Sequence, residues 1–587
     1  MIRLHPWSRK ETGVRRRTRA LGILTTLLLA GGAVSLAAPA GAGTSDTRTT
    51  AAVSTASAAR TTAECQGDWL PATPTSAEVM SGQVRFLDLP PVKIGKTVDW
   101  NWSPYKNRSW DMVFSSLRWV GRLVADYETS GEQGLLTRAT ELTKSWVESN
   151  PRGGSRASRY AWDEHPIALR APVLVCLSRH VSASWLTGSL ADHAVMLANP
   201  ALYEKGHNHG LDQDIALLRI GCRTGHKEWA DLAVRRMTGS VKLDIDAQGA
   251  LQEQAPRYGI YVHERLKVGM DAIKDCGRKV PAEIEKRWDS LTGYITHATE
   301  PSGYMAPIGD GGADVKPSGY EHPEKTVRVF DAGYVFGRTA WDKPESAYYT
   351  IRFGPGLKFH GHEDHLGVTY YAQGRDVLVE AGFHSYERTA YRYWTMSPEA
   401  HNVPVVVGRP FRGRTATSLV RASVGGDRQS YKLADKAYGV TRTRTVLVNH
   451  GDDLMAVLDT VPAGARARSY WHLDPALTPV STSGGRVVVK DRSGWKATVV
   501  QLAMPSCEPV SGQTVVRGRT NPYQGWISPT YMSKVPASVI VSPAAGSLLT
   551  IVVPGAGDPE VTCSGARVKV TTSAGTVSFR AASGNLS

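Results

Sequence analysis

The chain has 587 residues, of which 69 are Lys or Arg and 54 are Asp or Glu, so the formal net charge is +15. This length exceeds what one compact core normally holds, which excludes a single small domain and predicts two or more domains. Residues 1–42 contain seven of the basic residues and one acidic residue, which leaves a net charge of +9 on the remainder. That modest excess favours an anionic partner.

The first 42 residues have the features of a secretory signal peptide. Arginines at positions 15, 16, 17 and 19 precede an apolar stretch over residues 21–36, and two A-x-A sites follow at 38–40 and 40–42. This order is typical of an export signal, and the arginines favour the twin-arginine route. No later stretch is long and apolar enough to span a bilayer, so we expect a secreted, extracellular protein without a membrane anchor.

Residues 43–80 are rich in Thr, Ser and Ala and are predicted to form a disordered linker. From about residue 108 to 300 the apolar residues then recur at helical spacing, in stripes at 117–127, 135–148, 166–181, 185–198, 209–223, 228–239, 258–275 and 282–298. Many amphipathic helices with short connections indicate a helical-hairpin array or (α/α) toroid, which we place at residues 81–312.

After about residue 325 the apolar period changes to two. The segment VTYYAQGRDVLVEA (368–381) predicts two strands around a turn at Gln373 and Gly374, and many short strands follow it to the end of the chain. Such a series indicates an antiparallel β-sandwich, which we place at residues 313–587. The glycine-rich stretch PIGDGGAD (307–314) is the predicted junction.

Six cysteines in an exported chain can form three disulfides. A Cys507–Cys563 pair is the first choice because both residues lie in the β-rich region, and a Cys176–Cys222 pair is the second. The cysteines do not have zinc-ligand spacing, and the chain lacks zinc-finger and aromatic RNA-binding motifs, so no nucleic-acid partner is expected.

Three polar segments are candidates for the functional site. They are HNHGLDQD (207–214) at the start of a helix, DIDAQGALQEQAPRYGIYVHE (244–264), and FHGHEDH (359–365) with its continuation at 374–406. Each has a structural alternative: Asn208 could cap its helix, Tyr258 could be a packing residue, and the histidines could form a solvated strand end. On an extended strand His360, His362 and Asp364 would share one face.

The order of these motifs resembles that of the heparinase II/III-like polysaccharide lyases. Asn-His-Gly at 208–210 is followed by G-x-x-x-E-x-x-x-x-Y at 249–258, H-G-H-x-D at 360–364, L-V-E-x-G at 378–382 and His-Asn at 401–402. The layout also matches, because that family joins an (α/α) toroid to an antiparallel β-sandwich. The resemblance extends over residues 95–410 by motif.

This resemblance implies cleavage of a glycosidic bond beside a uronic acid by β-elimination. Asn208 and His209 would neutralise the substrate carboxylate, so that the C5 proton becomes acidic. Tyr258 would be the general acid, or both acid and base, and His360 a base or an orienting residue. The remaining predicted substrate contacts are Arg257, Tyr261, Arg392 and Tyr393.

Some members of the family also hold a structural zinc, and the matching residues here are His362, Glu380 and His401. Imidazole and carboxylate groups are suitable zinc ligands. The family's usual carboxylate is Asp rather than Glu, and a simple hairpin around Gln373 would place Glu380 opposite Gly367. The segment 360–365 would therefore have to bend back for the three side chains to meet.

Two other functions fit parts of the sequence. A glycoside hydrolase with two carboxylates would use Asp212, Asp214 or Glu253, and a non-catalytic polysaccharide-binding protein would stack sugars on Trp100, Trp102, Trp110 and Trp162. For a lyase, the expected substrate is an anionic polysaccharide, with a glycosaminoglycan such as heparin or heparan sulfate favoured and alginate or another polyuronate as the alternative. The basic run GRPFRGRT (408–415) would either line the substrate groove or form a solvated loop.

Overall fold

The computed structural model describes residues 71–587 except 96, 156 and 574, so the predicted signal peptide and most of the predicted linker lie outside the described residues. The last residues of that predicted linker differ from the prediction, because they form helix α1 (Ser76–Met80). Thr75 and Glu78 make a capping box, in which the Glu78 N–H donates to Thr75 Oγ1 and the Thr75 N–H donates to Glu78 Oε2. Val79 anchors this turn in the helical core.

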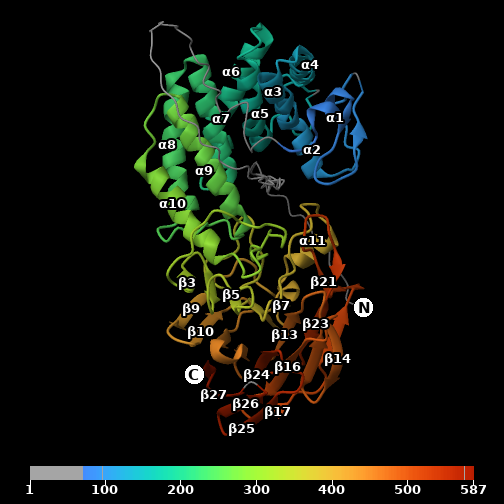
Figure 1. Ribbon diagram of the computed structural model, residues 1–587, viewed down its shortest axis with the longest axis vertical. Coiled ribbons are helices and arrows are strands. Elements are labelled where there is room, and N and C mark those ends of the chain that lie inside the picture. The colour runs from blue at the N-terminus through green and yellow to red at the C-terminus, as the bar shows by residue number, and fades with distance from the viewer. Residues whose placement is uncertain (1–70, 96, 156, 574) are drawn as a thin grey trace, which may run out of the picture.

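The N-terminal half is mainly helical and lies at one end of the elongated molecule (Figure 1). It also holds a short antiparallel pair, β1 (Gln83–Val84) with β2 (Val92–Lys93). Every predicted apolar stripe corresponds to a helix, which confirms the toroid-type architecture. Their bounds are α2 (Arg108–Ser115), α3 (Arg118–Ser130), α4 (Gln133–Ser149), α5 (Glu164–Leu177), α6 (Ser184–Ala198), α7 (Asn208–Thr224), α8 (Lys227–Asp244), α9 (Arg257–Asp275) and α10 (Ala282–His297).

Helix α7 occupies the centre of this half and packs against α5, α8 and α9. Fourteen consecutive residues of α7, from Asn208 to Gly221, are buried, so polar side chains in this helix must find partners inside the protein. The core beside it contains Trp110, Trp119 and Trp146, none of which is exposed. The suggestion that Trp110 stacks on sugars is therefore wrong.

The C-terminal half is built from antiparallel sheets, as predicted. The first sheet has the order β3-β4-β5-β6-β7, and the largest has the order β14-β15-β16-β24-β12-β11-β10-β9, with β17 paired to β16. The two smaller four-stranded sheets are β18-β23-β13-β8 and β25-β26-β27-β28. The strands of the first sheet are β3 (Val327–Phe330), β4 (Tyr334–Arg338), β5 (Tyr348–Arg352), β6 (Val368–Ala372) and β7 (Arg375–Leu378). Those of the largest sheet are β9 (Ser418–Ser423), β10 (Arg428–Asp435), β11 (Arg442–Asn449), β12 (Leu454–Thr460), β14 (Thr478–Ser483), β15 (Arg486–Lys490), β16 (Lys496–Ala503), β17 (Glu508–Pro509) and β24 (Ser547–Pro554). The smaller sheets contain β8 (Pro404–Val406), β13 (Ala467–His472), β18 (Thr514–Arg517) and β23 (Ser538–Val541), and β25 (Glu560–Ser564), β26 (Arg567–Thr572), β27 (Gly575–Ala582) and β28 (Asn585–Leu586).

The central strands β11, β12 and β24 of the large sheet are buried on both faces, and alternate residues of each strand point to opposite faces. On β11, Val446 and Val448 pack toward the first sheet, whereas Leu447 packs toward β26 and β27. The same alternation holds on β12, where Met455 and Val457 face the first sheet. The C-terminal half is thus three layers deep at this point.

The first sheet also joins the two halves. Tyr334 and Phe336 of β4 belong to the helical core and pack against Tyr294 of α10, while Val335 between them faces the sandwich core. Burial of large aromatic side chains on both faces makes this junction a continuous packed core. Residues of the sandwich are thereby held at fixed positions beside the helical ends.

Among the described residues, two cysteine pairs form disulfides that close segments within the halves. Cys507 bonds to Cys563, which confirms the first predicted pair. Cys222 bonds to Cys276, so the predicted Cys176–Cys222 pair is wrong. Cys222 lies in the last turn of α7 and Cys276 directly follows α9, and the contact between those two helices brings their ends together. Across residues 71–587, apart from the three omitted positions, no helix meets the length and hydropathy needed to cross a bilayer.

Candidate active site

A cleft of about 840 Å³ lies where the first helices of the toroid face a loop of the sandwich. The toroid contributes residues from 100–111 and 158–163, and the sandwich contributes Tyr386, Glu387 and Arg388. The loop is tied across the cleft by Glu387, whose Oε1 accepts a 2.8 Å hydrogen bond from the Arg108 N–H at the start of α2. Its lining mixes four basic residues with three acidic ones: Lys106, Arg108, Arg159, Arg388, Asp111, Asp163 and Glu387.

Asn208, the first residue of α7, is fully buried and is held by Glu253. Its backbone N–H donates to Glu253 Oε1 at 2.6 Å, and its side-chain Nδ2 donates to Glu253 Oε2 at 2.7 Å. These two bonds fix the amide so that Nδ2 also lies 3.4 Å from His360 Nε2, while Oδ1 has no partner among the described residues. His207 is the residue that caps α7, so Asn208 is free of that role.

Tyr258 and His360 form the second part of the site. Tyr258 is the second residue of α9, and its ring stacks on that of His360 with centroids 3.6 Å apart and an interplanar angle of 3°. The Tyr258 hydroxyl lies 2.8 Å from the hydroxyl of Tyr386, which lines the cleft. Burial raises the pKa of Tyr258 well above its ordinary value, so this phenol is protonated and can act as an acid.

Asp310 orients His360 from the opposite side. Its Oδ2 lies 3.4 Å from His360 Nδ1, and the Asp310 backbone N–H donates to the His360 carbonyl at 2.8 Å. Burial opposes ionisation of Asp310, but Arg392 and the two neighbouring histidines hold its pKa below the ordinary value. Because the ionised carboxylate faces Nδ1, the proton of neutral His360 belongs on Nδ1, and the lone pair of Nε2 faces Asn208.

Close backbone approach brings Asp310 to this position. Gly309 has a φ of +63°, and a Cβ there would lie 2.5 Å from the His360 carbonyl oxygen and 2.7 Å from that of Gln254. Only glycine fits such an approach at positive φ. The stretch PIGDGGAD, which the sequence indicated only as a domain junction, therefore supplies a site residue.

His209 lies beside Asn208 but faces a different set of partners. Its Nδ1 is 3.2 Å from Glu164 Oε1, and its ring stacks on His165 at 3.7 Å. Its Nε2 is buried with no partner among the described residues. Burial lowers the pKa of His209, so the imidazole is neutral and its Nε2 is open to a ligand group.

The four predicted substrate contacts have different surroundings. Tyr393 is 61% exposed on α11 (Ala390–Thr395), whereas Arg257 pairs with Asp314 at 2.8 Å near the surface. The other two are held inside the protein. Tyr261 donates to Asp212 at 2.5 Å within a buried ion cluster that includes Arg265, and Arg392 is buried in a 2.6 Å ion pair with Asp310, so both have structural partners.

The carboxylates proposed for a hydrolase are likewise engaged. Arg265 donates to Asp212 at 2.6 Å, Tyr203 donates to Asp214 at 2.8 Å, and Glu253 holds Asn208. All three are buried, with at most 1% of the residue exposed. The arrangement lacks the paired acid and base that hydrolysis at these residues would need.

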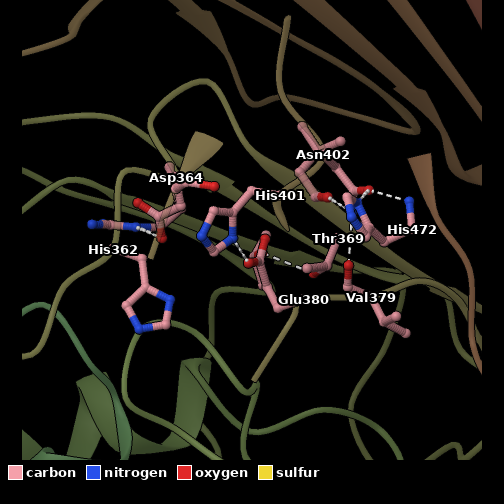
Figure 2. Close-up of polar contacts among 12 residues, drawn as sticks. His362, Asp364, Thr369, Val379, Glu380, His401, Asn402 and His472 are labelled. Atoms are coloured by element: carbon pink, nitrogen blue, oxygen red, sulfur yellow. Dashed lines mark hydrogen bonds and ion pairs between the residues drawn. The ribbon is translucent and has the colours of Figure 1, made fainter. Parts of the chain in front are cut away.

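The predicted zinc ligands lie on the sandwich side of the site (Figure 2). His362 and His401 have ring centroids 5.3 Å apart, and His362 Nδ1 and His401 Nε2 are both buried without partners among the described residues. Two imidazoles on one zinc ion, with Zn–N bonds of about 2 Å, have ring centres roughly 5–6 Å apart. The spacing of the two rings is compatible with one shared metal ion, although these residues are not among the groups of three ligand atoms that lie within 4.8 Å of one another in the described part of the chain.

Glu380 is placed differently from the prediction. Its Oε2 contacts His401 Nδ1, the ring nitrogen opposite the unpartnered Nε2 (Figure 2). A carboxylate on the far nitrogen is the usual way to orient a metal-binding histidine. The nearby carboxylate with a free buried oxygen is Asp364, whose Oδ1 has no partner among the described residues and whose Oδ2 accepts from Arg352 at 3.0 Å.

A second group, His207, Glu253 and His360, offers possible metal-ligand atoms that all lie within 4.8 Å of one another. The His209 N–H donates to His207 Nδ1 at 3.3 Å, so neutral His207 carries its proton on Nε2. Both oxygens of Glu253 already accept from Asn208. These bonds fit a hydrogen-bonded catalytic group better than a metal site.

Asn402, the second residue of the His-Asn pair, is a structural crosslink. Its Nδ2 donates to the carbonyls of Val368 and Val379, and its Oδ1 accepts from the His472 N–H at 2.6 Å (Figure 2). It thus joins β6, the end of β7 and β13 directly behind His401. Sequence reasoning missed this role, as it missed Asp310 and Tyr386 in the site.

Comparisons with known proteins agree with this architecture. The family description "Heparinase II/III N-terminus" matches residues 58–333, and "Heparinase II/III-like, C-terminal" matches residues 329–573. No curated protein sequence matches the chain.

Two solved structures share the fold at low identity. One, described as heparinase III, is 16% identical with a TM-score of 0.70, over 83% of this chain and 86% of that chain. The heparan sulfate lyase HepC from Pedobacter heparinus is 16% identical with a TM-score of 0.62, over 86% and 87%. With both family descriptions matched in order along its length, the chain belongs to the heparinase II/III-like family of polysaccharide lyases.

Proposed function

We propose that this protein is a secreted lyase that cleaves a uronic-acid-containing anionic polysaccharide by β-elimination, with a glycosaminoglycan of the heparan sulfate type as its substrate class. The observation behind this proposal is the convergence of Asn208, Tyr258 and His360 beside the cleft, although they come from two helices and the sandwich. Together they provide an amide donor, a protonated phenol and a neutral imidazole, which are the groups that elimination requires.

In the proposed reaction, Asn208 Nδ2 donates to the uronate carboxylate and stabilises the charge that develops on it. Because ionised Glu164 keeps the proton of neutral His209 on Nδ1, His209 can donate from Nε2 to the same carboxylate only after it takes up a proton. His360 Nε2 removes the C5 proton, because Nε2 is the unprotonated nitrogen, with only a long 3.4 Å contact to Asn208 Nδ2, while Nδ1 faces Asp310. The electron pair forms the C4–C5 double bond, the C4–O4 bond breaks, and Tyr258 protonates the leaving oxygen. Glu253 and Asp310 hold Asn208 and His360 in the orientations that these steps need.

Two observations support the substrate class. Similar structures include proteins described as heparinase III and heparan sulfate lyase. The cleft also pairs its four basic residues with three acidic ones, which suits a polymer with spaced carboxylates better than a densely sulfated chain. The basic run 408–415 is not part of the cleft lining, which favours the solvated-loop interpretation. Alginate or another polyuronate is the alternative substrate.

A structural zinc is part of the proposal. His362 and His401 would hold it, with Glu380 orienting His401, and the ion would join the segment after β5 to the segment before β8. Asp364 would be the third ligand once its side chain moves closer, because the ligand atoms of these three residues do not all lie within 4.8 Å of one another. This ligand set replaces the predicted trio, in which Glu380 was itself a ligand. The ion would supply stability, and no step of the elimination depends on it.

The deciding experiment uses the purified mature protein with heparan sulfate, heparin, chondroitin sulfate, hyaluronan and alginate. A lyase produces a conjugated double bond that absorbs ultraviolet light, a hydrolase produces saturated products, and a binding protein leaves the polymer intact. Ultraviolet-absorbing product from a glycosaminoglycan is expected, and saturated fragments or an unchanged polymer would contradict the proposal. Export is tested by the N-terminus of the secreted protein, expected near residue 41 or 43.

A further inference from the structure

The proposed reaction leaves a negative charge on a buried oxygen. When Tyr258 gives its proton to the leaving group, its phenolate remains on a residue that is only 4% exposed. Burial is the main reason that the pKa of Tyr258 lies well above its ordinary value. A charge at this oxygen is therefore costly unless a neighbour shares or removes it.

Tyr386 is placed to remove that charge. Its hydroxyl lies 2.8 Å from the hydroxyl of Tyr258, and its side chain is partly exposed and lines the cleft. The loop that carries it is anchored on both sides: Gly382 bridges to Ser528, the ring of Phe383 packs at 4.5 Å from that of Tyr386, and Glu387 bonds to the start of α2. These contacts hold the Tyr386 side chain between the buried Tyr258 and the open cleft.

We propose that Tyr386 is a proton-relay residue that restores the proton of Tyr258 during elimination. This inference rests on the proposed lyase function. As Tyr258 passes its proton to the leaving oxygen, the Tyr386 O–H donates its proton to the Tyr258 oxygen, and the charge moves to Tyr386. Water in the cleft then protonates Tyr386, and His360 releases the C5 proton to water, so both groups return to their starting states.

The test is Tyr386→Phe, which keeps the ring packing against Phe383 and removes only the hydroxyl. We expect kcat to fall about 10²-fold, at the lower end of the range for acid–base groups, with little change in KM. In mixtures of light and heavy water, a plot of kcat against the deuterium fraction (a proton inventory) should be curved for the wild type, because two protons move together. The same plot should be linear for the variant. A purely structural role would not change the inventory.

The matched control is Tyr391→Phe, a nearby phenol whose hydroxyl lies 3.0 Å from Ser528 Oγ and which is not part of the cleft lining. It should keep wild-type turnover. If a folded Tyr386→Phe protein turns over substrate like the wild type, the relay is wrong but the proposed lyase function stands. The relay is also wrong if Tyr258→Phe is active while Tyr386→Phe is inactive. Absence of unsaturated product from the wild type on every polymer would overturn the proposed function and the relay with it.

Discussion

Tyr258 and His360 stack face to face, 3.6 Å apart, although one begins a toroid helix and the other comes from the sandwich. The proposed acid and base are thus held in contact by the junction between the two halves. Because both rings are buried, the stack contributes to stability as well as to position. Hydroxyl removal and ring removal should therefore have different consequences.

Tyr258→Phe keeps the stack and removes the acid. We expect kcat to fall by about 10²–10⁴-fold with an unchanged melting temperature, whereas Tyr258→Ala should also lower the melting temperature because it leaves a cavity. Initial rates by ultraviolet absorbance and melting curves measure both effects. Tyr105→Phe, which loses only a hydrogen bond to the Pro90 carbonyl, is the control. Normal turnover in folded Tyr258→Phe would reject the assignment of Tyr258 as the acid.

Glu253→Gln should reduce turnover through Asn208. Both Glu253 oxygens accept bonds from Asn208, and a glutamine offers only one acceptor oxygen, so the amide of Asn208 loses its fixed orientation. We expect kcat to fall by about 10²–10³-fold, similar to the loss of one oxyanion donor in Asn208→Ala. Glu283→Gln, which alters a surface pair with Arg287, should be silent. Equal effects of Glu253→Gln and the control would show that Glu253 does not act through Asn208.

Metal analysis should find about one zinc per chain, lost in His362→Ala and His401→Ala together with thermal stability. Asp364→Asn should also lose zinc, whereas Glu380→Gln should weaken its binding by about 10–100-fold, as expected for an orienting partner. His322→Ala, at an exposed pair with Asp342, is the control. A folded protein without metal, or one in which Glu380→Gln and Asp364→Asn behave alike, would contradict this ligand set.

Asp163 should make substrate binding depend on pH. Burial, reinforced by Glu164, raises the pKa of Asp163 to about 6, and this residue lines the cleft. Its charge repels an anionic polymer above that pKa, so KM should fall as pH decreases from 7 to 5, by about 1 kcal/mol or roughly fivefold. Asp163→Asn should have a low KM across this range, while Asp192→Asn, at a surface pair with Arg152, should behave like the wild type.

The same pKa shift predicts the direction of the stability change. Because the folded-state pKa of Asp163 is raised, its contribution to stability is fully present below the ordinary value near 3.8 and is lost as pH rises through about 6. Asp163→Asn should therefore melt at a higher temperature than the wild type at pH 7, with the difference vanishing toward pH 4. A constant difference across this range would contradict a titrating Asp163.

The architecture was predictable because it depends on local periodicity. Apolar residues at helical spacing gave the toroid helices, and alternating residues gave the sandwich strands, since each pattern describes a single element packing one face against a core. The motif residues Asn208, Tyr258 and His360 were also found from the sequence, and the structure places them together.

The sequence alone determined the two kinds of secondary structure, their order, and the residue types available for elimination. Tertiary structure decided which side chains meet. Glu380 contacts His401. The hairpin that carries Glu380 also departs from the simple alignment, through a register shift at Tyr370 and Tyr371 and a turn from Asp364 to Gly367. Asp310, Tyr386 and the Cys222–Cys276 bond likewise depend on contacts between distant segments, which packing and backbone bends set and local periodicity does not encode.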